Sequence, residues 1–258
     1  MTIKTFISFL FVLLSIDSYT QICIQGVTKD RRGKIIEYVS IGFQEKGIGT
    51  ISDHQGTFLL NIPDSLQNDS LTFHHVSYNT VLLLPQDVNR DSIIRMEEKI
   101  TALPEISVVP KKISTKWLNR GFKIPGAYAF TENLGEEWGI SLKIKRQAIL
   151  KQVQFEIKTC TYDSVKLRIN IYKFNSDTQE VGEYLLSEPL YKTVEKYTEN
   201  KKITVDIPGL ISVNQEQILL SFEFVQFFGE GHIHYPVYKG NENNPIQAAV
   251  YGEIIEIG

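Results

Sequence analysis

Cysteine and histidine are scarce in this sequence, which limits the chemistry that it can support. Its 258 residues include 2 cysteines and 5 histidines. A disulfide framework in a secreted protein needs several closely spaced cysteines, so the two that are present predict none. We expect Cys23 and Cys160 to be independent buried thiols. A lipid anchor on Cys23 is disfavoured, because Ile22 stands where a lipid-attachment motif has a small residue.

Charge of one sign is not concentrated anywhere in the chain. There are 27 basic and 30 acidic residues, a net charge of −3 at pH 7 and no block of like charges. A nucleic-acid-binding surface requires a basic patch, so we expect no nucleic-acid partner. Beyond the N-terminal segment no apolar run approaches the roughly 20 residues of a membrane-spanning helix. We therefore expect no integral membrane span in the mature chain.

Sequence motifs of several common enzyme classes are missing. There is no Gly-x-Ser-x-Gly nucleophile motif, no phosphate-binding loop and no Gly-x-Gly-x-x-Gly. These motifs place a nucleophile or a phosphate group by backbone geometry, so their absence leaves those chemistries without support. We expect a protein that is not an enzyme and that carries no cofactor.

The N-terminus carries an apolar segment of a recognisable length. Lys4 precedes the run from Phe6 to Leu14, and Asp17 follows it. This run is too short to span a bilayer but suits the apolar region of a secretory signal. We expect residues 1–20 to be a signal peptide and the protein to be exported to the periplasm, the outer membrane or the cell surface. An uncleaved anchor or a buried strand is the alternative.

Alternation of apolar and polar residues dominates the rest of the chain and predicts β-strands. Turns recur about every ten residues in the range 22–97, as in a small β-sandwich. Residues 36–43 alternate as one strand of it. In the second half, 165–171 and 219–224 alternate as strands with one face in the core and the other in solvent. The run 247–257 is apolar on both faces, which predicts a central position in a sheet.

The second half also suggests a sandwich, separated from the first by a linker. Turn residues at 175–177, 208–209 and 229–231 divide it into roughly eight to ten strands, a pattern that suggests a jelly-roll-like β-sandwich. Pro104 and Pro110 flank a short β-prone run, and proline is poorly tolerated in a central strand. The organisation we expect is all-β, with a signal peptide at 1–20, one sandwich at 21–98, a proline-containing linker at 99–115 and a second sandwich at 116–258.

Several short segments of the first sandwich carry a resemblance to a known domain. They are Ile24-Gln25-Gly26-Val27, Val39-Ser40-Ile41, Gly49-Thr50, Ser52-Asp53-His54-Gln55-Gly56-Thr57-Phe58, Ile62-Pro63 and Val76-Ser77-Tyr78. On these residues the chain resembles the carboxypeptidase-regulatory-like domain of Bacteroidetes envelope proteins. The resemblance implies a seven-stranded transthyretin-like sandwich, is nearly silent on chemistry and does not carry over peptidase activity. The zinc-binding His-x-x-Glu pair of the carboxypeptidases themselves does not occur, and residues 116–258 remain unassigned.

The turn between Asp53 and Gly56 has a local physical explanation. An aspartate side chain can accept hydrogen bonds from backbone amides two residues on, and glycine tolerates positive φ. Phe58 is then expected to enter the core. Asp53 as a metal ligand is the alternative, but calcium needs six to eight oxygen ligands and one carboxylate does not supply them.

His232 and His234 are the most metal-like pair in the sequence. Two residues apart on a strand, they face the same side about 7 Å apart, which makes half of a metal site. Such a pair occurs in cupin-type jelly-roll enzymes, which also need a glutamate shortly afterwards and a later histidine. Neither follows here, although Glu230 can substitute for one of them. We expect no metal site, and the residues read as a partly exposed strand edge.

Acidic and aromatic residues offer two further candidates. Glu136 and Glu137 precede Trp138, but adjacent carboxylates face apart on a strand, so a glycosidase pair requires another acid from elsewhere. Trp117 and Trp138 are candidates for glycan stacking, with Tyr128, Tyr162 and Tyr235 as further aromatic residues. Aromatic residues in a small sandwich also serve as core, which is the competing interpretation.

Four Asp-Ser-aliphatic triplets resemble the O-glycosylation signal of exported Bacteroidetes proteins. Their serines are Ser65, Ser70, Ser92 and Ser164. The same dipeptide is also common in turns, which explains it without modification.

Together these observations favour an exported, non-enzymatic protein of the cell envelope. The first sandwich is expected to act as a spacer, and the second as an interaction module for an envelope protein or a glycan. The first alternative is a glycan-binding accessory protein of polysaccharide uptake. The second is a metal-dependent jelly-roll enzyme at His232 and His234.

Overall fold

The computed structural model describes residues 21–44, 46–88, 92–99, 113–118, 122–214, 216–239, 246–248 and 250–257. The expected signal peptide at 1–20 and residues 100–112 of the expected linker lie outside this range.

Almost every element in the described residues is a β-strand, which confirms the all-β prediction. In chain order they are β1 (Gln21–Asp30), β2 (Ser40–Phe43), β3 (Ile48–Ile51), β4 (Thr57–Pro63), β5 (Leu71–His74), β6 (Val81–Leu83), β7 (Ser92–Met96), β8 (Ile113–Leu118), β9 (Phe122–Phe130), β10 (Glu137–Lys143), β11 (Ala148–Cys160), β12 (Ser164–Asn175), β13 (Glu180–Tyr184), β14 (Leu190–Glu195), β15 (Glu199–Val213), β16 (Gln217–Phe228), β17 (Ile233–Lys239), β18 (Ile246–Ala248) and β19 (Val250–Ile257). Short 3-10 turns occur at Asp64–Leu66 and Pro85–Asp87.

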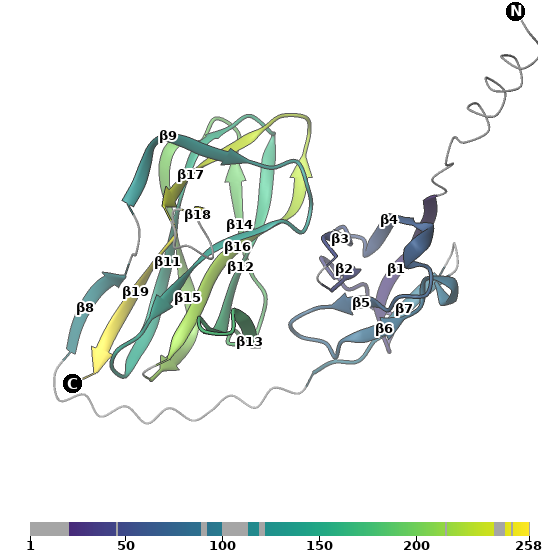
Figure 1. Cartoon of the computed structure of the whole chain (residues 1–258), viewed down its shortest axis with the longest axis horizontal. Helices are drawn as coiled ribbons and strands as arrows, with labels where there is room; N and C mark the ends of the chain where they lie inside the picture. The colour runs from purple at the N-terminus through teal and green to yellow at the C-terminus, as the bar shows by residue number, and fades with distance from the viewer. Residues whose placement is uncertain are drawn as a thin grey trace, which may run out of the picture.

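Strands β1 to β7 form the first sandwich. One sheet has the order β4-β1-β7 and the other β3-β2-β5-β6, with β1 and β7 parallel and the other pairs antiparallel. Inward-facing side chains from both sheets, such as Ile24, Phe58, Ile62 and Phe73, make one apolar core. Figure 1 shows these strands in purple to blue, apart from the strands of the second half.

Strands β8 to β19 form the second sandwich. One sheet has the order β10-β16-β12-β13, with β14 also on β12. The other has the order β18-β17-β11-β19-β8, with β15 also on β11 and β9 also on β17. Figure 1 shows β19 between β11 and β8, so residues 250–257 have the expected central position, whereas β18, which holds Ala248, lies at the edge of the sheet. The described part of the second sandwich contains twelve strands, where roughly eight to ten were expected. Short strands such as β13 and β18, which lie between the long ones, account for the difference.

The region before β2 departs from the expected strand. The alternation over 36–43 predicted one continuous element, but β2 begins only at Ser40. Tyr38 has φ of +56°, a left-handed conformation outside the extended region that regular strand residues occupy. Consequently Tyr38 and Val39 are both buried although they are adjacent in sequence. Ser52 holds this bend by accepting, at its side-chain oxygen, the backbone N–H of Val39 at 2.9 Å.

Pro208 and Gly209 do not form the expected turn between strands. Both lie inside β15. The pairing of β15 with β11 shifts there, since Leu150 pairs with Ile211 but Gln152 pairs with Asp206. A β-bulge at this point accommodates Pro208, which has no backbone N–H, and Gly209, whose φ is +78°, without ending the strand.

The two cysteines are both free thiols, but only one is buried. Cys160 belongs to the core of the second sandwich, whereas Cys23 is exposed at the start of β1. The expectation of two buried thiols was therefore wrong for Cys23, whose strand position points away from the core residues Ile22 and Ile24.

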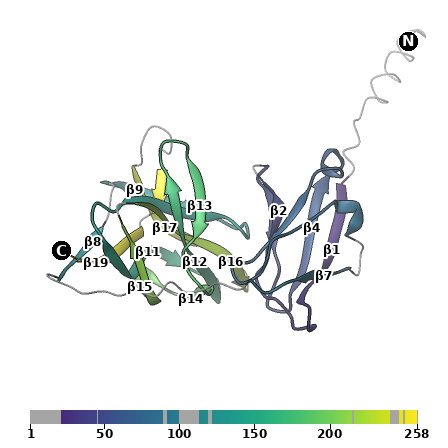
Figure 2. The ribbon, with the colours of Figure 1, turned by 90° about the horizontal axis from the view of Figure 1, so that it is seen from below.

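A small third apolar cluster joins the two sandwiches. Tyr38 and Ile51 of the first contact Val225 of the second, with Leu134 and Tyr191 packed against them. Figure 2 shows the first sandwich beside the end of the second that carries β16 and β12. Among the helical elements that the structure describes, none has the length and apolar character needed to cross a membrane.

Candidate functional site between the two sandwiches

A row of polar side chains crosses the outer face of the sheet β10-β16-β12. On β12 the odd-numbered residues from Val165 to Ile171 fill the core, so Arg168 and Asn170 point outward. Arg168 pairs with Glu223 on β16, and Glu223 pairs with Glu137 on β10. Because directly paired residues lie on the same face of a sheet, these three side chains form a continuous line over three strands.

Arg168 and Glu223 form a buried ion pair at the centre of this row. Their residues are 4% and 5% exposed. The Nε and Nη2 atoms of Arg168 donate to Glu223 Oε2 at 2.9 and 2.6 Å. Burial lowers the pKa of Arg168, but the charge of Glu223, the neighbouring Tyr191 and the hydrogen bond to Glu223 together raise it by more, so the guanidinium remains charged.

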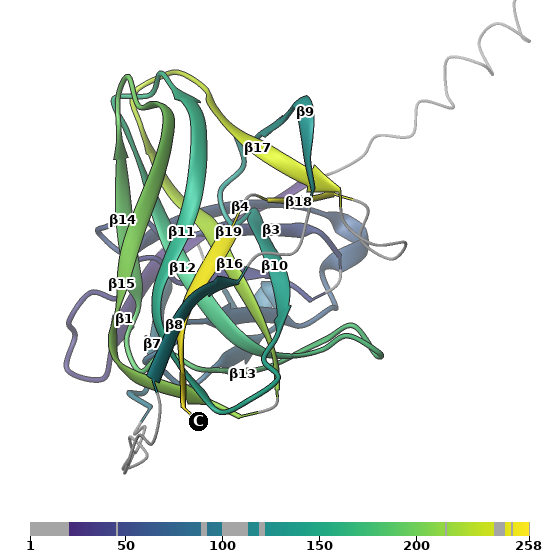
Figure 3. The ribbon, with the colours of Figure 1, turned by 90° about the vertical axis from the view of Figure 1, so that its left-hand side faces the viewer.

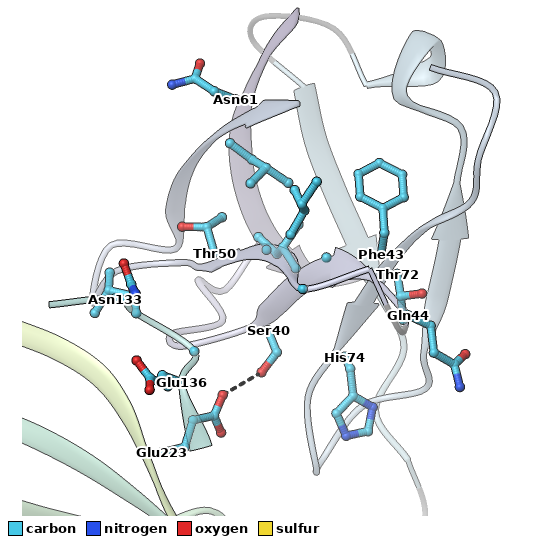
Figure 4. Close-up of a pocket in the computed structure, with 18 residues that line it drawn as sticks. Ser40, Phe43, Gln44, Thr50, Asn61, Thr72, His74, Asn133, Glu136 and Glu223 are labelled. Atoms are coloured by element: carbon cyan, nitrogen blue, oxygen red, sulfur yellow. Dashed lines mark hydrogen bonds between the residues drawn. The ribbon is translucent and has the colours of Figure 1, made fainter. Parts of the chain in front are cut away.

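The same guanidinium reaches across to the first sandwich. Its Nη1 donates to the backbone oxygen of Tyr38 at 2.8 Å, and its Nη2 donates to Ser40 Oγ at 2.5 Å. The hydroxyl of Ser40 also donates to Glu223 Oε1 at 3.4 Å, as Figure 4 shows. One buried side chain of the second sandwich is thus bonded to two residues of the first, Tyr38 in the bend before β2 and Ser40 in β2.

Tyr38 completes the contact from the other side. Its ring meets the ring of Tyr191 edge to face, with centroids 5.2 Å apart. Its hydroxyl donates to Gln226 Oε1 at 2.8 Å and accepts from Lys166 Nζ at 3.0 Å. A non-glycine residue held at positive φ costs about 1–3 kcal/mol and persists only when its surroundings over-determine it. The contacts with the second sandwich supply that constraint at φ of +56°.

Glu137 lies beside the ion pair and shares a donor with it. Asn170 Nδ2 donates to Glu137 Oε1 at 2.8 Å and to Glu223 Oε2 at 3.0 Å. Ser221 also donates to Glu137. Although part of the Glu137 side chain is exposed, removal of its carboxyl group from water and then the charge of Glu223 raise its pKa. This carboxyl therefore holds a proton to a higher pH than a free glutamate does.

Glu223 is the additional acid that the sequence did not identify beside Glu136 and Glu137. Strand pairing brings it opposite Glu137 from 86 residues away in the chain. The amide of Asn170 occupies the space between the two carboxylates, and Arg168 and Asn170 both bond to Glu223 Oε2. A glycosidase pair needs the scissile bond in that space. The geometry is that of a structural network rather than of a catalytic pair.

A cleft of about 850 Å³ opens beside this network, between the two sandwiches. The first sandwich contributes residues of β2, β3 and β5, including Ser40 and His74, and the second contributes Glu136 and Glu223. Figure 4 shows Ser40 and His74 on the side of the first sandwich that faces these acids. A smaller cavity of about 230 Å³ shares Ser40, His74 and Glu223 and adds Tyr172 and Tyr184. Both spaces are lined by hydrogen-bonding groups as well as apolar ones.

His74 is the last residue of β5 and is exposed, whereas His75, which follows the strand, is 6% exposed. Burial first, and then the charges of Arg168 and His74, lower the pKa of His75 to about 3. The His75 ring is therefore neutral at pH 7.

The sequence-predicted histidine pair lies far along the other sheet, on β17 and the residue before it. The His232 and His234 rings are 4.9 Å apart. Within the described residues no group of three histidine, cysteine, aspartate or glutamate side chains is arranged to hold a metal ion. The third ligand that a metal-dependent enzyme requires is thus not found in the part of the chain that the structure describes, and Glu230 does not supply it.

The two tryptophans are not brought together. Trp117 on β8 is 44% exposed. Trp138 on β10 packs against the core, with its ring 5.4 Å from that of Tyr235, and its Nε1 donates to Glu136 Oε1 at 2.7 Å. Of the further aromatic residues, Tyr162 and Tyr235 are buried and Tyr128 is exposed.

The four serines of the Asp-Ser triplets lie at the surface to different degrees. Ser65 and Ser70 are exposed, and Ser92 and Ser164 are half-buried. Their modification remains a prediction.

Comparison with known proteins adds little. No family model matches the chain, and no curated protein matches it. A structure of the infectious bursal disease virus Gx strain is 11% identical over 92% of this chain and 56% of the other, with a TM-score of 0.32. The VP2 subviral particle of the same virus gives 11% identity, 92% and 60% coverage and a TM-score of 0.29.

A structure of carbohydrate-binding modules from the β-sandwich superfamily is also similar to this chain. It is 11% identical over 86% of this chain and 84% of the other, with a TM-score of 0.20. The chain spans little more than half of the Gx-strain structure, 56% of its length. TM-scores this low carry no argument about function.

Proposed function

We propose that this chain is an exported, non-enzymatic protein of the cell envelope. In this proposal the first sandwich is a spacer held in a fixed orientation on the second, and the second binds an envelope protein or a glycan. The observation that carries it is the buried Arg168, which bonds to Glu223 in its own sandwich and to Tyr38 and Ser40 in the other.

A fixed orientation follows from the energetics of that contact. Removing one partner of a buried ion pair costs about 3–5 kcal/mol, because it leaves an uncompensated charge. Any hinge motion that separates the sandwiches leaves Arg168 with only part of its partners and removes the Tyr38 ring from Tyr191. Relative motion is the usual expectation for two domains within one chain. This junction is built to resist such motion.

The carboxylates at the junction support binding over catalysis. Glu223 is engaged by Arg168, Asn170 and Ser40, so its oxygens are committed to the protein itself. A general base or nucleophile must instead present an oxygen to its substrate. The proposal that the first sandwich is of the carboxypeptidase-regulatory-like type is supported by its seven described strands and by the turn at Asp53 and Gly56.

The fixed orientation can be tested by measuring a distance between the sandwiches. A spin label on the exposed native Cys23 and another on Glu180→Cys, on exposed β13, report on the first and second sandwich respectively. Burial raises the pKa of Cys160 and makes that thiol poorly reactive. Double electron–electron resonance should give one narrow distance distribution.

The variants compare the effect of removing the buried ion pair at the junction with the effect of removing an exposed ion pair. Arg168→Met should broaden the distance distribution. The double variant Arg168→Met with Glu223→Leu should also broaden it, and it should stay folded because it leaves no unpaired charge of the Arg168–Glu223 pair buried. Lys196→Met removes an ion pair with Asp163 whose side chains are 40% and 66% exposed, and should leave the distribution narrow. A broad distribution in the unmodified protein, or an unchanged one in both Arg168 variants, contradicts the proposal.

A further inference from the structure

An exposed group of aromatic and histidine side chains lies on the second sandwich, away from the junction network. Strand β9 pairs with β17, and β17 pairs with β11, as Figures 1 and 3 show for β9 and β17. The register places Phe130 beside His234 and His234 beside Thr159. Directly paired residues share a face, so these side chains lie together on the outer side of the sheet.

Two large rings on β9 face solvent there. Phe130 is 63% exposed and Tyr128 is 42% exposed, while Ala129 between them packs against the core. Two residues apart on one strand, Tyr128 and Phe130 have Cα atoms about 7 Å from each other and side chains on the same face. Lys158 Nζ lies 5.4 Å from the centre of the Tyr128 ring. Adjacent exposed rings differ in this respect from single exposed apolar side chains, which need no explanation, because contiguous apolar surface is where partners bind.

The histidines extend this row with hydrogen-bonding rings. The Phe130 and His234 rings meet edge to face at 6.0 Å, and His232 follows 4.9 Å from His234. Thr159 Oγ1 contacts His234 Nδ1 at 3.0 Å, and Thr161 Oγ1 contacts His232 Nδ1 at 3.1 Å. Each threonine fixes the orientation of one imidazole. In the described part of the chain the two Nε2 atoms have no hydrogen-bond partner.

The chemistry of this face selects among ligands. A metal ion finds only two histidines there, with no third ligand in the described residues. An acidic or basic partner needs a cluster of opposite charge, whereas this row carries one lysine, Lys158, and one glutamate, Glu199, which pairs with Thr159. A sugar chain offers apolar C–H faces and neutral hydroxyls. Exposed aromatic rings with neutral hydrogen-bonding groups between them match both.

We propose that this face binds a neutral glycan chain. Tyr128 and Phe130 stack on sugar rings, and the Nε2 atoms of His232 and His234 bond to sugar hydroxyls. The inference deepens the proposed function, on which it rests, by assigning the partner-binding surface and the class of partner. It also moves the stacking residues from Trp117 and Trp138 to β9.

Affinity electrophoresis in gels that contain a soluble polysaccharide tests this assignment. Hydroxyethylcellulose, xylan, galactomannan, pullulan and starch serve as neutral probes and heparin as a charged one. We expect retardation of the full chain by at least one neutral probe and none by heparin. Phe130→Ala and Tyr128→Ala should each weaken binding at least tenfold, and His234→Phe, which keeps a ring but removes its nitrogens, should weaken it severalfold.

Trp117→Ala is the matched control, because Trp117 is also a large exposed ring of the same sandwich but lies on β8, beyond β19 and β11. Its retardation should equal that of the unmodified protein. Unchanged circular dichroism spectra establish that all variants are folded. The proposal is overturned if no neutral probe binds, or if binding survives the loss of Phe130 and Tyr128.

Two other results also overturn it. One is that the protein binds zinc but no polysaccharide, and that His232→Asn abolishes the zinc binding. This result assigns His232 and His234 to a metal site. The other is an envelope protein that cross-links to this face in place of a glycan. In each case the spin-label distance between the sandwiches stays narrow, so failure of this inference is distinguishable from failure of the proposed function.

Discussion

Acid should destabilise this protein through one buried histidine. His75 follows β5 and is 6% exposed. Its Nδ1 accepts the backbone N–H of Ser77 at 3.2 Å, and its ring meets Tyr78 edge to face at 5.2 Å. Its pKa is lowered from 6.5 to about 3, first by burial and then by the charges of Arg168 and His74. The folded protein therefore resists a proton that the unfolded chain accepts readily.

The sign and size of the effect follow from proton linkage. Between about pH 3 and 6.5 the unfolded chain binds more protons at His75 than the folded one, so the free energy of unfolding falls as the pH falls. At pH 5, 1.5 pH units below the unfolded pKa, the loss is about 2 kcal/mol, at about 1.36 kcal/mol per pH unit. Below pH 3 the full difference of about 3.5 pH units costs about 5 kcal/mol.

Urea unfolding at several pH values between 7.5 and 5 measures this loss. His75→Asn keeps an acceptor for the Ser77 amide but does not titrate, so its stability should decline by about 2 kcal/mol less than that of the unmodified protein. Subtracting the stability of one protein from that of the other at each pH cancels the contributions of the remaining titrating groups. Glu137 is one of them, and its raised pKa acts in the opposite sense, because it favours the folded state at low pH.

The unfolding should be followed by circular dichroism and not by tryptophan fluorescence. Both tryptophans lie in the second sandwich, whereas His75 lies in the first. His232→Asn, at an exposed histidine, is the matched control and should follow the unmodified protein. Equal pH dependence for His75→Asn and the unmodified protein refutes the reasoning.

Three further outcomes are expected. Gly56→Ala should lower the free energy of unfolding by at least about 1–2 kcal/mol in urea, since φ is +72° and a Cβ atom would lie 2.8 Å from the Thr28 carbonyl oxygen; a loss under about 0.5 kcal/mol contradicts this. Tyr235→Phe should raise stability by about 1 kcal/mol by tryptophan fluorescence, because its buried hydroxyl has no partner among the described residues; a decrease contradicts it. The intact mass of the exported protein should show cleavage near Gln21 and added hexose-containing mass, and a mass of polypeptide alone ends the O-glycosylation hypothesis for Ser65, Ser70, Ser92 and Ser164.

Local chemistry made part of the fold predictable. Asp53 Oδ1 accepts the backbone N–H groups of Gln55 and Thr57 at 2.8 and 2.9 Å, and Gly56 has positive φ, as the turn sequence predicted. Phe58 enters the core as expected. These features depend on atoms within a few residues of one another, so the sequence contains all the information they need.

The candidate site was not predictable in the same way. Alternation over 165–171 correctly placed the odd-numbered residues in the core, but it predicted that Arg168 and Asn170 face solvent. Both are buried, because the first sandwich covers this face. The left-handed Tyr38 that makes the covering contact has no sequence signal of its own, since tyrosine ordinarily avoids positive φ.

Side-chain periodicity and turn chemistry are local, so they could be recognised in the sequence as strands with a core face and as turns between them. Which of the outward faces is covered and which stays open depends on how distant strands pack together. Strand pairing brought Glu137 opposite Glu223 and Phe130 beside His234 from distant parts of the chain. A polar residue such as Arg168 is stable on either kind of surface, in water or in a buried ion pair, so its pattern in the sequence is the same in both cases.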